Sequence, residues 1–206
     1  MTIKEFTAFG SGLKIAMRDL EIRGAGSVLG ERQHGHLNTV GYDLYMRLLS
    51  EAVAEEQGSE VPSKSDCQMD IAVSAFLSSD YVEREESRID LYKKIAAIEN
   101  REDLADITDE LCDRFGDPPK EAVDLMRIAL LRGTARVCGV SEIKQKGTTV
   151  LIFLERGDPE RLFAAVNDFK GRLRLSNAAR PYLTLYLTDG DIIDQMQAVI
   201  DYIGKK

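Results

Sequence analysis

The stretch SEIKQKGTTVLIFLE, residues 141–155, marks the point where the hydrophobic pattern of the chain changes from helical to extended. Lys146 and Gly147 lie between two extended runs, and the second run, 150–154, is apolar throughout. A glycine-containing turn between two such runs is typical of a β-hairpin. These residues therefore predict two neighbouring antiparallel strands with Lys146-Gly147 in the turn.

The sequence after this hairpin repeats the same change of pattern. A helix is predicted over 158–169, which opens on an aspartate-proline pair suited to a cap and a first turn. The segments 172–176 and 182–187 then alternate with period two, and a last helix is predicted over 192–204. The resulting order is β-β-α-β-β-α, on a small antiparallel or mixed sheet.

Three helices are predicted before the hairpin, over 83–99, 101–115 and 120–139. Asn100 can cap the second of them, and Gly116 can end it. The fold class is therefore α/β in the α+β sense: a mixed domain of about three helices plus a small sheet with the β-β-α-β-β-α tail. A helical hairpin, described below, precedes this domain.

Two shorter features complete this region. CQMDIAVSAFL, residues 67–77, is a candidate for one short strand. Gly133 lies inside the third predicted helix, where glycine costs about 1 kcal/mol relative to alanine. Its presence there predicts a close crossing with another part of the chain.

The first 58 residues predict two amphipathic helices, over 11–23 and 42–57, joined by a glycine-rich connector. The following residues, 59–65, have the Gly, Ser, Pro and charge composition of a linker. We therefore expect three parts: a helical hairpin over 1–58, the linker over 59–65 and the mixed domain over 66–206.

The connector, within DLEIRGAGSVLGERQHG at 19–35, combines permissive backbone with donor side chains. Its glycines are Gly24, Gly26 and Gly30, and the donors in and around it are Arg18, Arg23, Arg32, Gln33, His34 and His36. They are consistent with a solvated loop or with a contact to a polyanion or a partner, and the glycines favour the contact because bare backbone can approach a phosphate closely. A dinucleotide fingerprint would have to follow a strand, and the two histidines lack a third metal ligand nearby. We predict no catalytic residue and no metal site.

Composition sets broader limits. The chain has 206 residues, 44% hydrophobic and 30% charged, with a net charge of −8. This composition favours a folded protein. The negative net charge argues against a protein that binds nucleic acid over its whole surface. Three distant cysteines without a CxxC pair favour buried free thiols and a reducing cytoplasm, and no apolar run is long enough for a membrane span.

Four stretches of the sequence, two of them in the predicted hairpin, resemble a known protein family. IKEFTAFGSGLKIAMRDLEIRGAGSVLGERQHG at 3–35 and VGYDLYMRLLSEAV at 40–53 closely resemble bacterial transcription-repair coupling factors, and SRIDLYKKIA at 87–96 and ELCDRFGDPP at 110–119 are similar to their C-terminal domain. The spacing Arg-Gly-x-Gly-x-x-x-Gly-x-x-Gln resembles the TRG motif, named for translocation in RecG.

This resemblance implies a function. In the family, the TRG motif is a helical hairpin that follows the second RecA-like motor lobe and couples ATP turnover to movement on duplex DNA, so Arg23 and Gln33 are the expected coupling residues. The family's C-terminal domain is a regulatory module that packs on an N-terminal UvrB-like domain and masks the surface that recruits UvrA in nucleotide excision repair. The family acts on stalled RNA polymerase.

The resemblance also implies that this chain is a C-terminal piece of a larger helicase-like ATP hydrolase, in which ATP and Mg²⁺ bind upstream. The chain itself contains no phosphate-binding GxxxxGK[ST] loop, so we expect it to hold no cofactor and to hydrolyse no ATP. Two alternatives stay open on the residues alone. One is a self-sufficient protein-interaction adaptor, and the other is a small metal- or nucleotide-dependent enzyme.

Overall fold

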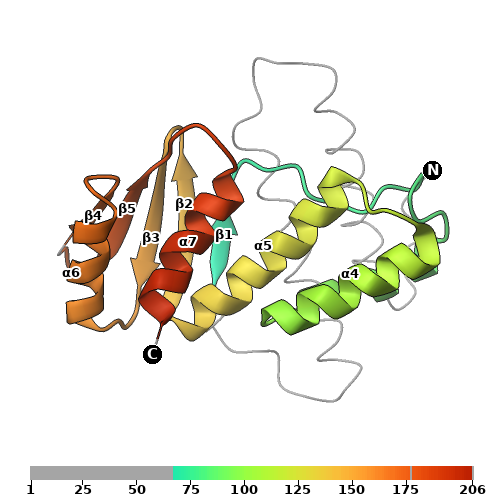
Figure 1. Cartoon of the computed structure of the whole chain (residues 1–206), viewed down its shortest axis with the longest axis horizontal. Coiled ribbons are helices and arrows are strands. Elements are labelled where there is room, and N and C mark those ends of the chain that lie inside the picture. The colour runs from blue at the N-terminus through green and yellow to red at the C-terminus, as the bar shows by residue number, and fades with distance from the viewer. Residues whose placement is uncertain (1–66, 177, 206) are drawn as a thin grey trace, which may run out of the picture.

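The structure, a computed structural model, describes residues 67–176 and 178–205. Five strands in this part of the chain form one mixed sheet in the order β1-β2-β3-β5-β4 (Figure 1). β1 runs parallel to β2, and the other neighbours are antiparallel. The strands are β1 (Gln68–Asp70), β2 (Val140–Lys146), β3 (Thr149–Leu154), β4 (Leu173–Ser176) and β5 (Tyr182–Tyr186).

Five helices complete the described part, which is therefore of mixed α/β class. They are α3 (Glu85–Ala96), α4 (Arg101–Phe115), α5 (Lys120–Val137), α6 (Pro159–Asp168) and α7 (Ile192–Gly204). The helices α5, α6 and α7 lie on one side of the sheet, and α4 extends away from the sheet beyond α5 (Figure 1). From residue 140 onward the elements follow the predicted order β-β-α-β-β-α. The predicted hairpin of residues 1–58 and the linker at 59–65 lie outside the described residues.

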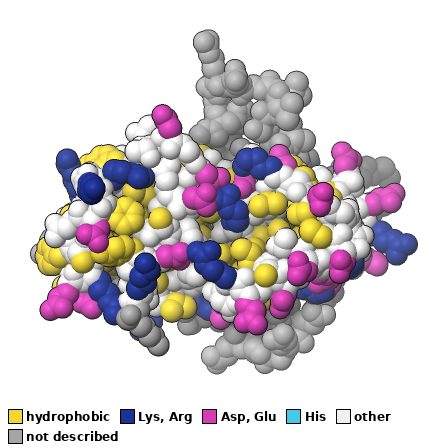
Figure 2. All heavy atoms as spheres, in the orientation of Figure 1, with side chains coloured by type: hydrophobic (Ala, Val, Ile, Leu, Met, Phe, Trp, Pro, Cys, Tyr) yellow, Lys and Arg dark blue, Asp and Glu magenta, His cyan; other side chains and the backbone are white. Residues whose placement is uncertain are grey.

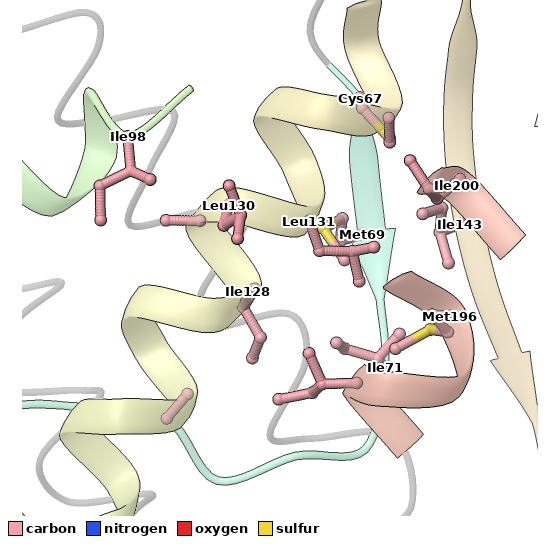
Figure 3. Close-up of a cluster of buried hydrophobic side chains, with 14 of the residues drawn as sticks. Cys67, Met69, Ile71, Ile98, Ile128, Leu130, Leu131, Ile143, Met196 and Ile200 are labelled. Atoms are coloured by element: carbon pink, nitrogen blue, oxygen red, sulfur yellow. The ribbon is translucent and has the colours of Figure 1, made fainter. Parts of the chain in front are cut away.

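The core forms between the sheet and the helices on its covered side. Alternate strand residues such as Ile143, Ile152 and Leu183 are fully buried there against side chains of α5 and α7. Figure 3 shows how Met69 and Ile143 of the strands face Met196 and other side chains of the helices. Each fully buried Leu or Ile contributes about 1.5–3 kcal/mol, so this interface contributes strongly to the stability of the fold.

The segment predicted as a strand over 67–77 is a strand only over Gln68–Asp70. Beyond Asp70 the backbone no longer pairs with the backbone of β2. The Ala72 N–H donates instead to the side-chain Oε1 of Gln145 at 2.8 Å. Further on, the Phe76 N–H donates to the Glu121 carbonyl at 3.3 Å and the Leu77 N–H to Tyr92 Oη at 2.8 Å. Because helices α3 and α5 provide the later acceptors, the apolar run packs on helices instead of extending the sheet.

The central hairpin is confirmed, with one shift. Lys146 pairs with Thr149, so it ends β2 and does not lie in the turn. The turn is made by residues 147–148, and Gly147 has φ 58°, in the left-handed region that glycine adopts without strain. A bulge between Val140 and Glu142 lets Ser141 leave the regular alternation.

The close crossing predicted at Gly133 is confirmed. A Cβ atom at this position would lie 2.8 Å from the Ile98 carbonyl oxygen and 2.9 Å from the Glu99 Cα. Both are backbone atoms, so no rotation of a side chain can make room. The glycine thus lets the α3–α4 connection lie directly on α5.

We expect Gly133→Ala to lower the free energy of unfolding by about 2 kcal/mol, because the clash outweighs the gain of about 1 kcal/mol in helix propensity. Urea unfolding followed by circular dichroism measures this. Gly147→Ala is the control, since its site is open and only the positive φ costs about 1 kcal/mol. A Gly133→Ala variant more stable than the wild type would contradict the close crossing.

An ion cluster joins the N-terminal ends of α5 and α7. Arg127 donates to both carboxylate oxygens of Asp191, at 2.8 and 3.0 Å, and to Asp194 at 2.7 Å. It also donates to Asp124 at 3.0 Å, and Lys120 pairs with the same carboxylate. Since Asp124 is only 2% exposed, these two cations compensate a buried charge.

This cluster predicts a loss of stability in acid. The hydrogen bonds from Arg127 lower the pKa of Asp191 to about 2, so its stabilisation is complete above the ordinary aspartate value of about 4 and disappears as the pH falls toward 2. The side chain of Asp191 is 34% exposed, so we expect only about 1 kcal/mol after solvent screening. Urea unfolding between pH 2 and 5 measures it. Asp191→Asn should reduce the change in the free energy of unfolding between pH 5 and pH 2 by that amount. An unchanged pH dependence would contradict the role of Asp191.

Candidate protein-interaction surface

Charge is distributed unevenly over the described part of the chain. Residues 80–117, which we call the acidic arm, contain six basic and thirteen acidic residues, a net charge of −7. Residues 118–206 contain fourteen basic and eleven acidic residues, a net charge of +3. Within the arm, α3 is electrically neutral and α4 has a net charge of −4, so the excess of acid lies on α4 and on the segments that flank the two helices.

The outward side of α4 carries a row of carboxylates. Glu102, Asp106, Asp109 and Asp113 are all exposed and follow one another by four, three and four residues, which places them on one face of the helix. We call this row the acidic ridge. Acidic side chains lie along α4 in the space-filling view (Figure 2). Like charges at this spacing cost about 0.2–0.5 kcal/mol per pair, so the ridge does not stabilise the helix it lies on.

The sequence around α4 fixes both ends of this helix. Asn100 Oδ1 accepts from the N–H groups of Glu102 and Asp103, and the Asp103 side chain accepts in return from the Asn100 N–H at 3.2 Å. Gly116 ends the helix with φ 80°, as predicted, and its carbonyl accepts from the Tyr81 hydroxyl at 2.8 Å. The ridge therefore lies on a helix with defined ends.

The side of α4 toward α3 is electrostatically satisfied. Glu110 accepts from Lys94 of α3 at 2.8 Å with both oxygens and also pairs with Arg114. The hydrogen bond between Lys94 and Glu110 lowers the pKa of Glu110 and raises the pKa of Lys94. By contrast, none of the ridge carboxylates forms an ion pair with another described residue. The unpaired charge of α4 thus points away from the domain.

The two helices of the arm contact the rest of the domain differently, since α3 buries four of its residues and α4 buries one. Leu111 is the one buried residue of α4. At the α3–α4 connection Arg101 donates to Asp201 of α7 at 2.7 Å, Arg132 donates to the Ala96 carbonyl at 3.1 Å, and Arg136 pairs with Glu99. Helix α3 is therefore packed into the core, whereas the outer side of α4 is exposed among the described residues.

The predicted site residues lie elsewhere in the chain. Arg18, Arg23, Gly24, Gly26, Gly30, Gln33 and His34 are outside the described residues, so the structure does not test their roles. The prediction that all three cysteines are buried is wrong: Cys67 is buried, Cys138 is half-buried and Cys112 is exposed on α4. Cys112 directly precedes Asp113 of the ridge and is exposed, whereas Leu111 takes the buried position of that turn.

Within 67–176 and 178–205, no three His, Cys, Asp or Glu side chains gather as metal ligands would. In the same ranges no helix has both the length and the apolarity needed to cross a membrane. The arrangement can instead present fixed charge to a basic surface.

The ridge was not predicted as a site, although the sequence contains its signal. REDLADITDELCDRF places acids at 102, 106, 109 and 113 once the helix is recognised. Only the packing decides which of its other acids, such as Glu110, are neutralised by a neighbouring helix. The sequence alone therefore shows an acidic helix but not its free side.

The fold and the sequence together define the class of the domain. Residues 71–163 match the family model of the TRCF domain. A crystal structure of the C-terminal domain of a transcription-repair coupling factor is similar over 67% of this chain and 89% of that chain, with a TM-score of 0.58 and 21% identity. The chain therefore carries a TRCF domain, and the mixed α/β class is confirmed.

Curated relatives name the particular protein to which the chain is similar. It is 46% identical over 155 residues to a transcription-repair-coupling factor of Staphylococcus epidermidis, which covers 74% of this chain and 13% of the relative. It is 42% identical over 193 residues to that of Staphylococcus aureus, covering 90% of this chain and 16% of the relative. The predicted relationship to the C-terminal part of the transcription-repair coupling factor is confirmed, and the chain spans about one sixth or less of these relatives.

Proposed function

We propose that this chain is the C-terminal part of an ATP-dependent DNA translocase that displaces stalled RNA polymerase and recruits UvrA in transcription-coupled repair. Support comes from the TRCF domain at 71–163 and from relatives that carry the name of the coupling factor. On this proposal ATP, Mg²⁺ and duplex DNA bind to other parts of the protein, in the cytoplasm. The chain by itself hydrolyses no ATP.

The described domain acts as a regulatory docking unit. Its acidic ridge binds a basic surface of the N-terminal UvrB-like domain and thereby masks the surface that UvrA uses. The observation that carries this role is the net charge of −7 on residues 80–117, with ridge carboxylates that no other described residue neutralises. Complementary charge speeds association and selects partners, which suits a contact that must open and close.

A direct titration tests the docking. The UvrB-like domain of a transcription-repair coupling factor, produced separately, is titrated with the 206-residue chain in a calorimeter at two salt concentrations. We expect a one-to-one complex whose affinity falls as salt is raised, because exposed charges are screened. Absence of a complex at low salt, or an affinity that does not depend on salt, would overturn the proposed contact.

The helical hairpin couples the motor to DNA. Arg23 holds the hairpin through a carboxylate, and Gln33 binds a phosphate or a backbone group, with the glycines between them allowing movement. In the complete protein we expect Arg23→Ala or Gln33→Ala to leave ATP binding intact but to reduce displacement of a triplex strand by at least tenfold. Gly147→Ala, in the turn between β2 and β3, serves as the control. Unchanged displacement in both variants would contradict this role.

A further inference from the structure

The second face of the sheet bears aromatic and basic side chains in neighbouring strands. Because α5, α6 and α7 pack on one face, the alternate residues of each strand point to the other side, which we call the outer sheet face (Figure 1). Among the described residues no helix packs on it. Its members include Asp70 of β1, Glu142, Lys144 and Lys146 of β2, Leu151 and Phe153 of β3, Tyr182, Thr184 and Tyr186 of β5, and Arg174 of β4.

The strand pairing brings the aromatic rings together. Phe153 and Tyr182 are directly opposite each other, and their ring centroids are 5.3 Å apart. Tyr186 lies four residues along β5 from Tyr182, a distance of about 13 Å at the usual rise of a strand. All three side chains are half-buried, so each still presents part of its ring to solvent.

Guanidinium groups already stack on two of these rings. The Arg180 guanidinium lies 4.6 Å from the centroid of Phe153, and that of Arg174 lies 5.2 Å from the centroid of Tyr186. Both arginines are exposed. Each guanidinium covers the ring face that it contacts, so a planar ligand on that side would stack on the outer side of the exposed guanidinium, with the ring beneath it.

The charge of this face is opposite to that of the acidic arm. Two acidic residues lie on it, and each is neutralised: Glu142 accepts from Arg180 at 2.9 Å, and Asp70 is 3.6 Å from Lys144. With Lys146 and Arg174, four basic residues stand against these two acids. In a chain of net charge −8, this is a local positive surface.

We propose that the outer sheet face binds single-stranded nucleic acid. Bases stack on Tyr182 and on the Arg180–Phe153 and Arg174–Tyr186 pairs, and phosphates contact Lys144 and Lys146. The span of about 13 Å accommodates roughly two or three nucleotides. A duplex fits less well, because its bases are stacked on one another and cannot use exposed rings. This site is separate from the acidic ridge, and neither depends on the other.

Fluorescence anisotropy with a labelled 15-nucleotide oligothymidylate tests the proposal on the whole chain. We expect salt-dependent binding that a hairpin duplex competes for at least tenfold less well. Arg174→Ala, an exposed change that leaves the fold intact, should weaken binding about tenfold, and Tyr186→Leu should do the same by removing a stacking surface. Arg156→Ala removes an equal charge from an exposed loop and should have little effect.

Several results would overturn it. The first is that the oligonucleotide does not bind even at 100-fold the protein concentration used for titration. The second is that Arg156→Ala weakens oligonucleotide binding as much as Arg174→Ala does. The third is that duplex DNA or an acidic peptide competes more strongly than the unlabelled oligonucleotide. An Arg174→Lys variant decides between charge and stacking: it should recover only part of the lost affinity, because lysine keeps the charge but lacks the planar group. Full recovery would contradict the stacked geometry. Binding of the UvrB-like domain should be unchanged in all these variants, which separates this test from that of the docking contact.

Discussion

Replacing Arg127 by methionine is expected to lower the free energy of unfolding by about 3 kcal/mol. Arg127 is the common partner of Asp124, Asp191 and Asp194, and it joins α5 to the N-terminal end of α7. Removing one partner of a buried pair leaves an uncompensated charge, which typically costs 3–5 kcal/mol. The lower end applies here because Lys120 still pairs with Asp124.

Urea unfolding at pH 7 measures this loss. Lys120→Met is the control, since this lysine is largely exposed and contributes about 1 kcal/mol or less. A second substitution, Asp124→Leu in the Arg127→Met background, should restore part of the stability because it removes the buried charge. An Arg127→Met variant that loses less than 1 kcal/mol, or a double variant no more stable than the single one, would contradict a buried role for this pair.

Reversing charge on the acidic ridge is expected to weaken docking on the UvrB-like domain about 100-fold. In Asp106→Lys/Asp109→Lys, two attractive contacts become repulsive, and like charges across an interface cost several kcal/mol. The change also removes repulsion between neighbouring carboxylates on α4, so the domain should remain folded. Calorimetric titration gives the affinity, and circular dichroism confirms the fold.

A matched variant controls for net charge. Glu155→Lys/Asp189→Lys changes the total charge by the same amount at two exposed positions outside the arm, and it should weaken docking less than threefold. Equal weakening by both double variants would show a general effect of charge. That result would contradict the ridge as the contact surface.

Much of the fold could be predicted because its signals are local. Asn100 and Gly116 bound α4 as expected, since capping and the left-handed turn depend only on nearby backbone. The alternation in 182–187 likewise identified β5, where a strand must show one face to the core. Gly133 was understood correctly, because a glycine inside a helix needs a steric reason.

The predictions that were wrong concern residues whose environment is set by partners far away in the sequence. The apolar run 67–77 is typical of a strand, but only three of its residues find a strand partner. The rest bind Gln145, Glu121 and Tyr92, which no local pattern reveals. Cys112 was expected to be buried from the habits of free cysteines, yet neighbouring Leu111 occupies the inward position of α4.

The two candidate surfaces also combine features that the local sequence predicts with features that only the packing of the elements determines. An acidic helix is visible in the sequence, but its free side is set by Lys94 on the adjacent helix. The outer sheet face combines residues from β2, β3, β4 and β5, and only the strand order places Arg174 and Arg180 beside the aromatic rings. Sequence patterns predict elements well, whereas surfaces depend on how those elements are ordered.

Competition between this chain and UvrA is the most direct test of the regulatory role. The UvrB-like domain is immobilised and saturated with UvrA, and the 206-residue chain is then added in increasing amounts. We predict that UvrA is released as the chain binds, and that the ridge variant Asp106→Lys/Asp109→Lys releases about 100-fold less at equal concentration. Simultaneous binding of UvrA and the chain to the same domain would contradict masking.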